Sequence, residues 1–182
     1  MTRVSLLLLL ATALAVPAGA QHGANGHGAT GRDAQVPSGL SADDVRGLLT
    51  GGGLGMARPA ELNGYPGPLH VIELAEPLQL TDEQLETAQQ LREAMLAEAV
   101  PLGRQLVDAE QALDAVFAAG DATEADIEQA VSHAASVHAR LRAVQLRTHL
   151  AMRDALTDDQ LRAYGRLRGH ASPAGGHQRR QH

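Results

Sequence analysis

Cysteine is absent from this chain of 182 residues. Without it the protein can form no disulfide bridge, thiolate metal cage or iron–sulfur cluster, and it has no thiol nucleophile. Aromatic residues make up only 2% of the chain, although hydrophobic residues reach 44%. The core must therefore consist mainly of Leu, Val and Ala, which suits closely packed helices better than a sheet sandwich. We predict an all-α fold.

Lysine is absent as well, so that all 15 basic residues are arginine, which favours paired contacts with carboxylates. The charges are unevenly distributed. Residues 81–132 contain 12 acidic residues and two arginines, whereas residues 133–182 contain three acidic residues and nine arginines. Because the whole chain has a net charge of -6, we expect no nucleic-acid partner.

The longest apolar run, residues 4–16, is shorter than the roughly 20 residues that a membrane-spanning helix needs. It follows Arg3 and precedes the small residues A-G-A at 18–20, a pattern typical of a cleavable secretory signal. We predict a signal peptide over residues 1–20, export to the periplasm and no membrane insertion after cleavage. A buried N-terminal helix is the alternative.

The rest of the sequence divides by composition. Residues 21–38 are rich in Gly and His and have few large apolar residues, which predicts a disordered arm. Residues 39–65 form a Gly-rich segment with one short helix. Residues 66–169 have the periodicity of helices and form the main domain, and residues 170–182 are predicted to be a disordered tail.

Two long helices are predicted in the main domain, at about 81–119 and 124–155, because apolar residues recur there at alternating steps of three and four. The short connection makes them antiparallel neighbours in a helical hairpin. Pro101 lacks an amide donor and should kink the first helix. At about 1.5 Å per residue the hairpin would be elongated, with short helices flanking it.

A six-residue motif occurs twice, as LTDEQL at 80–85 and as LTDDQL at 156–161. Its threonine suits the N-cap of a helix, and its glutamine suits the third helical position, from which the side chain returns a hydrogen bond to the cap. The leucines on either side have the spacing of a hydrophobic staple. We therefore assign a structural role to the motif residues Leu80, Thr81, Gln84, Leu156, Thr157 and Gln160.

The two LTxxQ motifs, separated by one long helical hairpin in an exported and cysteine-free chain, resemble the Spy/CpxP family of periplasmic stress proteins. The wider group includes periplasmic heavy-metal resistance and sensing proteins similar to CnrX and ZraP. The resemblance covers roughly residues 66–168 and implies a helical homodimer. It implies ATP-independent binding of unfolded proteins in the chaperone members, and a site of His, carboxylate and sometimes Met side chains in the metal-handling members. The chain departs from a typical Spy-like member by its lack of lysine and its Gly-rich segment before Tyr65.

Two of the nine histidines have a potential metal ligand one helical turn away. His70 is followed by Glu73, and His149 is followed by Met152. If the short helix folds back on the hairpin, or if a second subunit supplies it, these four side chains could bind Zn, Ni or Cu. The alternative is that they are ordinary surface histidines and a core methionine. We expect no required cofactor.

The C-terminal half of the second long helix combines arginines with apolar residues. Such a surface can attract unstructured chains by charge and hold them by adaptable apolar contact. The alternative is that the arginines only pair with the acidic first helix, where exposed ion pairs would add little stability. The candidate client-binding residues are Arg140, Arg142, Leu146, Arg147, Leu150 and Met152.

The sequence contains no pattern typical of an enzyme. It lacks HExxH and a serine nucleophile elbow, and its Gly-rich segment at 51–55 lacks the preceding strand and following lysine of a phosphate-binding loop. We therefore predict a non-enzymatic periplasmic stress protein that binds unfolded or misfolded proteins on a shallow helical surface without ATP. The alternative is a heavy-metal sensor or resistance protein, whose His/Glu/Met site changes its contact with a membrane-bound signalling partner.

Overall fold

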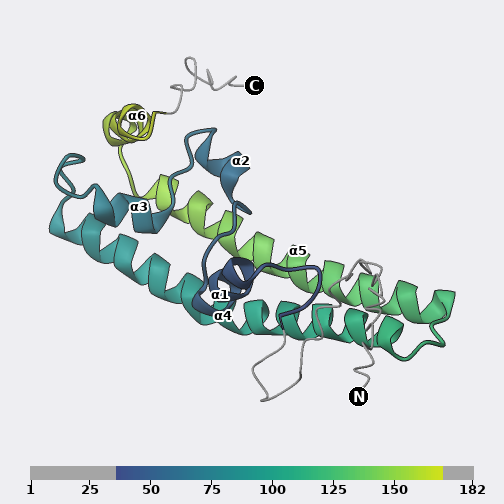
Figure 1. Cartoon of the computed structure of the whole chain (residues 1–182). Helices are drawn as coiled ribbons and strands as arrows, with labels where there is room; N and C mark the ends of the chain where they lie inside the picture. The colour runs from purple at the N-terminus through teal and green to yellow at the C-terminus, as the bar shows by residue number, and fades with distance from the viewer. Residues whose placement is uncertain (1–35, 170–182) are drawn as a thin grey trace, which may run out of the picture. The chain divides into compact units, whose positions relative to one another are not determined.

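The computed structural model describes residues 36–169 (Figure 1). This part of the chain forms six helices and no strand, so the all-α prediction is confirmed for it. None of these helices is long and apolar enough to cross a membrane. The predicted signal at 1–20, most of the arm at 21–38 and the tail at 170–182 lie outside the described residues. The helices are α1 (Ala42–Thr50), α2 (Arg58–Glu61), α3 (Pro68–Glu73), α4 (Asp82–Ala118), α5 (Glu124–Asp154) and α6 (Asp158–Leu167).

Four of the helices begin with a capping box. The N-cap hydroxyl accepts a hydrogen bond from the amide of the third helical residue, whose side chain accepts one from the N-cap amide. Acidic residues in the first turn of each helix add a favourable interaction with the helix dipole. The pairs are Ser41 with Asp44 in α1, Thr81 with Gln84 in α4, Thr123 with Asp126 in α5, and Thr157 with Gln160 in α6.

The two long helices, α4 and α5, pack along each other, and α1 lies against α4 (Figure 1). The contact between α4 and α5 forms the first hydrophobic core, and Leu48 of α1 also belongs to this core. Helix α4 continues through Pro101, which is exposed. The buried members from the long helices are Ala99, Leu102, Leu106, Val107 and Ala109 of α4, and Ala134, Val137, Leu141 and Val144 of α5.

Helix α1 approaches α4 so closely that the contact requires glycine. A Cβ atom on Gly103 would collide with the backbone carbonyl of Leu48. The segment before α1 also contacts α4, because the Ser38 hydroxyl and amide donate to Asp114 at 2.6 and 2.8 Å. These two hydrogen bonds, the hydroxyl first, lower the pKa of the Asp114 carboxyl. Residues 36–38, at the end of the predicted arm, are therefore part of the described fold.

A second hydrophobic core joins α3, α5 and α6 to the first turns of α4. Met152 and Val71 have no exposed surface, and Tyr164 is only 1% exposed. Leu156 is also buried here, so the second LTxxQ motif supplies a core residue as well as a helix start. The buried members are Val71, Leu78, Ala88, Met152, Leu156 and Tyr164.

The two motif glutamines contact each other although they are 76 residues apart. The side-chain amide nitrogen of each donates to the amide oxygen of the other at 2.9 Å. Gln84 Nε2 also donates to the Ala155 carbonyl at 3.0 Å, and Gln160 Nε2 donates to the Leu78 carbonyl at 3.4 Å. The starts of α4 and α6 are therefore joined by the same side chains that cap them.

Candidate functional site

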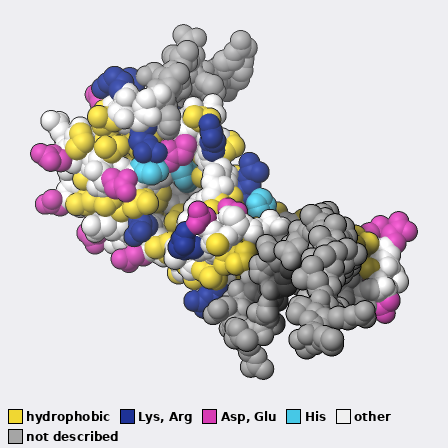
Figure 2. Space-filling view, in the orientation of Figure 1, with side chains coloured by type: hydrophobic (Ala, Val, Ile, Leu, Met, Phe, Trp, Pro, Cys, Tyr) yellow, Lys and Arg dark blue, Asp and Glu magenta, His cyan; other side chains and the backbone are white. Residues whose placement is uncertain are grey.

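A hollow with a volume of about 750 Å³ opens beside the Gly-rich segment. Its walls come from residues 50–55, from α2 and α3, and from the facing parts of α4 and α5. Two of the histidines singled out in the sequence, His70 and His149, line the hollow together with Glu61. On the face that Figure 2 presents, histidine side chains lie close to basic, acidic and hydrophobic ones. The hollow therefore has both polar and apolar walls.

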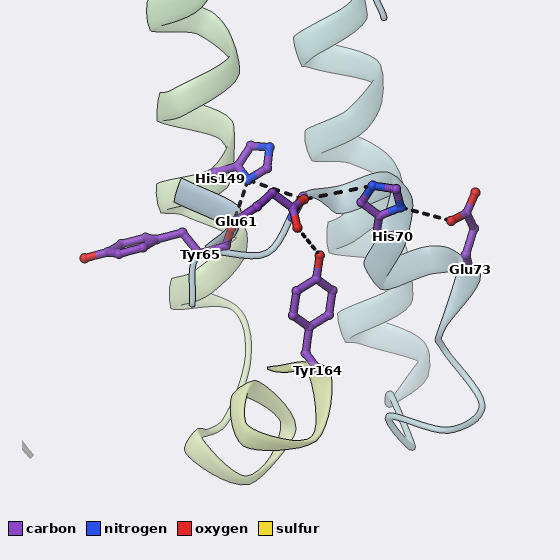
Figure 3. A network of polar contacts seen from close by, with 7 residues as sticks. Glu61, Tyr65, His70, Glu73, His149 and Tyr164 are labelled. Carbon is purple, nitrogen blue, oxygen red and sulfur yellow. Dashed lines mark hydrogen bonds and ion pairs between the residues drawn. The ribbon is translucent and has the colours of Figure 1, made fainter. Parts of the chain in front are cut away.

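Glu61, at the end of α2, lies at the centre of a polar cluster in this wall (Figure 3). Its Oε2 accepts a hydrogen bond from the Tyr164 hydroxyl at 2.8 Å, and its Oε1 accepts one from the Gly67 amide at 3.2 Å. Burial of Tyr164, reinforced by its bond to the Glu61 carboxylate, raises the pKa of the tyrosine well above its usual range. Tyr164 therefore keeps its proton and links α6 to α2 as a hydrogen-bond donor.

The two histidines flank this carboxylate, and Figure 3 shows Glu61 between their rings. His70 Nε2 and His149 Nδ1 each lie 4.0 Å from Glu61 Oε1. His149 Nδ1 also lies 2.9 Å from the Tyr65 carbonyl oxygen, and His70 Nδ1 lies 3.1 Å from Glu73 Oε2. Because a carbonyl or an ionised carboxylate only accepts hydrogen bonds, these contacts place a proton on Nδ1 of both rings. Nε2 is then the ring nitrogen that each histidine can offer to another group.

Arg153 holds the turn before α3 against α5. Its guanidinium carbon lies 4.5 Å from the centre of the Tyr65 ring, and its Nη1 donates to the Gly64 carbonyl at 3.1 Å. Gly67 in the same turn leaves room for His149, since a Cβ at this position would lie 2.9 Å from the ring carbon Cε1. The turn therefore places the Tyr65 carbonyl where it orients the His149 ring.

The structure brings three of the four predicted metal ligands to this cluster, but not the fourth. His70 and His149 flank Glu61, and Glu73 contacts His70 on the side away from Glu61, whereas Met152 is fully buried in the second hydrophobic core. In the part of the chain that the structure describes, no group of three or more His, Asp or Glu side chains is arranged to hold a metal ion. Met152 is therefore excluded from the predicted set of metal ligands. The carboxylate that lies next to the two histidines belongs to Glu61, which the sequence did not indicate.

Sequence reasoning missed Glu61, Tyr164 and Gln145, which all belong to the hollow or its wall. Helix α2 has only four residues and hence no periodic pattern, and the contact between Glu61 and Tyr164 joins residues 103 positions apart. The available signal was the rarity of aromatic residues, since Tyr164 is one of two tyrosines in the chain. Gln145 is a polar residue at a buried position of α5, which the apolar pattern around it does not predict.

The apolar members of the predicted client-binding set differ in exposure. Leu150 is 53% exposed, and Leu146 is half-buried. Met152 has no exposed surface, because its side chain packs with Val71 and Tyr164 in the second core. Met152 is therefore unable to contact a client of the folded chain, which corrects its place in the predicted set.

The three arginines of that set are all exposed. Arg147 donates to Glu98 of α4 at 3.3 Å, with both side chains more than half exposed. Arg140 and Arg142 form no ion pair with any of the described residues. Pairing with the acidic first long helix therefore accounts for one of the three arginines and leaves two available.

No protein-family model, curated protein or solved structure matches this chain. The resemblance to the Spy/CpxP group therefore rests on the doubled LTxxQ motif and its helical setting.

Proposed function

We propose that this chain is an ATP-independent, chaperone-like stress protein of the periplasm, which binds unfolded or misfolded proteins on the exposed face of α5. The proposal includes membership of the Spy/CpxP group, with export directed by residues 1–20. It also includes an antiparallel α4–α5 hairpin bent at Pro101 and a homodimer of such hairpins. The support is an exposed surface that combines apolar side chains with unpaired positive charge.

The apolar part of this face follows from helical spacing. Residues three, four or seven positions apart lie on the same side of an α-helix. Ala139, Ala143, Leu146 and Leu150 fit this spacing, and each is exposed or half-buried. The small alanines keep the surface shallow, while the leucines supply contact area. An extended or unfolded chain of varied sequence could lie on such a surface, because apolar contact of this kind does not depend on one particular side chain.

The charged part of the face supports the client-binding interpretation of the sequence. Arg140 and Arg147 are seven residues apart and border one side of the apolar strip, while Arg142 borders the other. The single observation that carries the proposal is that Arg140 and Arg142 are exposed without an ionic partner among residues 36–169. Unpaired positive charge beside apolar surface attracts acidic segments of a client over a distance of about 10 Å at moderate salt.

The test is suppression of aggregation of a reduced, unfolding model protein, measured by light scattering without nucleotide. We expect suppression at stoichiometric amounts of the chain. The variant Arg140→Gln/Arg142→Gln/Leu150→Ser should lose most of this effect. A matched control is Arg104→Gln/Leu167→Ser, which changes an exposed arginine of α4 and an exposed leucine of α6. Equal suppression by the two variants would contradict the assignment of this face.

One observation favours a second candidate, a heavy-metal sensor or resistance protein. His70 offers Nε2 at 4.0 Å from Glu61 Oε1, whereas His149 approaches the same oxygen with Nδ1, and the Nδ1 atoms of both rings are already engaged by oxygen acceptors. The His149 ring would have to turn to bring its Nε2 toward Glu61. Imidazole and carboxylate donors suit Zn, Ni and Cu, although the rings would have to move closer to Glu61 to share an ion.

Calorimetric titration with Zn, Ni and Cu tests this candidate. We expect submicromolar binding that His149→Ala abolishes and that His133→Ala, a change at an exposed histidine of α5, leaves unchanged. Metal binding that alters the oligomeric state without suppressing aggregation would favour a sensor with a membrane-bound signalling partner. If His149→Ala leaves the metal affinity unchanged, the assignment of a metal site to this cluster is wrong.

A further inference from the structure

We propose that the hollow beside the Gly-rich segment binds a small organic anion with an aliphatic body, of the class of medium-chain carboxylates. The hollow measures about 750 Å³, within the range of roughly 300 to 1,000 Å³ that small-molecule sites in proteins occupy. This inference does not depend on the proposed chaperone function, because the hollow uses residues other than those of the exposed α5 face.

The first support is an unsatisfied polar side chain in the wall of the hollow. Gln145 is only 3% exposed, and its Nε2 has no hydrogen-bond partner. A buried amide donor without a partner is rare in proteins and costs stability, which calls for an acceptor that the chain itself does not supply. The terminal torsion of glutamine is soft, so the amide can turn its NH₂ group toward the hollow. A carboxylate oxygen would satisfy this donor.

Access to this amide depends on the Gly-rich segment. A Cβ at Gly53 would lie 3.7 Å from Gln145 Oε1, which is ordinary van der Waals contact. A longer side chain at this position would therefore cover the amide. Gly53, which lines the hollow, therefore leaves this side of the amide uncovered.

The second support is the charge around the hollow. Arg58, Arg92 and Arg168 line it, and none of them forms an ion pair within residues 36–169. Among the described residues of the lining Glu61 is the only acidic one, and its carboxylate already accepts hydrogen bonds from Tyr164 and Gly67. The lining therefore has an excess of positive charge, which favours an anion over a neutral or cationic ligand.

The third support is the apolar part of the lining, which favours an aliphatic body over a bare inorganic ion. Leu54, Leu62 and Leu69 are 42%, 50% and 42% exposed although they are large hydrophobic residues. Met95 and Leu96 of α4 line the same space. A hydrocarbon chain that covered these side chains would remove apolar surface from water, which contributes about 25 cal/mol per Å². The combined walls fit a carboxylate with a chain of several carbons.

Isothermal titration of the full chain with octanoate, octanamide and acetate tests this inference. Octanoate should bind at one saturable site. Octanamide has the same chain without the charge, acetate has the charge without the chain, and each should bind at least about tenfold more weakly. Octanoate affinity should fall as salt is added. Equal affinities for octanoate and octanamide, or the absence of saturable octanoate binding, would overturn the proposal.

Variants locate the site. Arg92→Gln should weaken octanoate binding about tenfold. Arg104→Gln is the control, because Arg104 is exposed further along α4 and does not line the hollow, and it should leave the binding unchanged. Gln145→Leu should raise the melting temperature of the free protein, because it removes the unpaired donor, and should weaken octanoate binding about tenfold. Gly53→Leu should cover the Gln145 amide and reduce affinity without unfolding the chain. Unchanged octanoate affinity in Arg92→Gln, Gln145→Leu and Gly53→Leu would show that octanoate binds elsewhere and would overturn the proposal.

Discussion

The helix starts of α1 and α5 differ from those of α4 and α6 in the third helical residue. In α1 and α5 the third helical residue is aspartate, and its described hydrogen bonds all go to its own N-cap residue. In α4 and α6 it is glutamine, which caps its own helix and also donates to the other motif and to a distant carbonyl. The capping side chain thus makes only local contacts in α1 and α5, whereas in α4 and α6 it also makes tertiary contacts.

The difference follows from hydrogen-bonding capacity. An ionised carboxylate only accepts, so it can satisfy the N-cap and nothing that needs a donor. A side-chain amide accepts through its oxygen and donates twice through its nitrogen. The LTxxQ motif therefore does more than start a helix: its glutamine joins α4 to α6 and to the end of α5.

Replacing both glutamines by glutamate should have the largest effect. The variant Gln84→Glu/Gln160→Glu keeps two side chains that can cap but removes the donors and places two carboxylates opposite each other. We expect a loss of roughly 3 kcal/mol in the free energy of unfolding, measured in urea at neutral pH. Part of the loss should be recovered near pH 4, because a protonated carboxyl can donate again.

The matched control is Asp44→Glu/Asp126→Glu, which alters the two local caps. It should cost less than about 1 kcal/mol, since no tertiary contact is broken. Equal losses in the two double variants would show that the glutamine pair has no role beyond capping.

A double-mutant cycle should measure the link itself. Gln84→Ala and Gln160→Ala should couple by about 1 kcal/mol or more, because each removes the partner of the other. The corresponding changes at Asp44 and Asp126 should add within about 0.5 kcal/mol, since these residues do not share a contact. Additive losses at the two glutamines would contradict the tertiary role.

Loss of the N-cap hydroxyl should have a smaller effect, of the same size in both classes. Thr81→Ala, Thr157→Ala and Thr123→Ala should each cost about 1 kcal/mol in urea unfolding. Thr87→Ala is the control, because its hydroxyl donates only to the Glu83 carbonyl within α4. If Thr81→Ala cost nothing while Thr123→Ala cost about 1 kcal/mol, the glutamine pair alone would hold the start of α4.

The smallest expected effect is a dependence on pH that only the local caps have. The hydroxyl and amide of Thr123 lower the pKa of the Asp126 carboxyl below its ordinary value of 3.8. A lowered pKa adds stability that is present above this value and is lost as the pH falls through the folded-state pKa. Asp126→Asn should therefore flatten the fall in stability below about pH 4, as measured by thermal unfolding. An unchanged slope would exclude Asp126 as a source of acid sensitivity.

The helix starts and the pairing of the long helices could be predicted because local chemistry determines them. Capping residues and steps of three and four are visible within a few positions of the sequence. The contact between Gln84 and Gln160 could not, since capping already explains each glutamine in its own helix. Glu61 escaped for a related reason, because a four-residue helix has no pattern and its partners are distant in sequence.

For Met152, the spacing of apolar residues in α5 predicted the correct position, but the chemistry of its sulfur led us to predict a functional role. It lies eight residues after Val144 and eleven after Leu141, which places it on the buried side of α5. The sequence therefore indicated a core position, but the polarisable sulfur suggested a ligand or a client contact. The structure shows the core position, with no exposed surface.

The contact at Gly103 limits which substitutions the sequence can tolerate at this position. Backbone lies directly on backbone there, so the contact between α1 and α4 depends on the absence of a side chain at this position. A diverged protein could keep both LTxxQ boxes and the long helices, yet a substitution as small as alanine at this one position would move its first helix off α4. In a saturation library selected for folding, position 103 should accept glycine and almost nothing else.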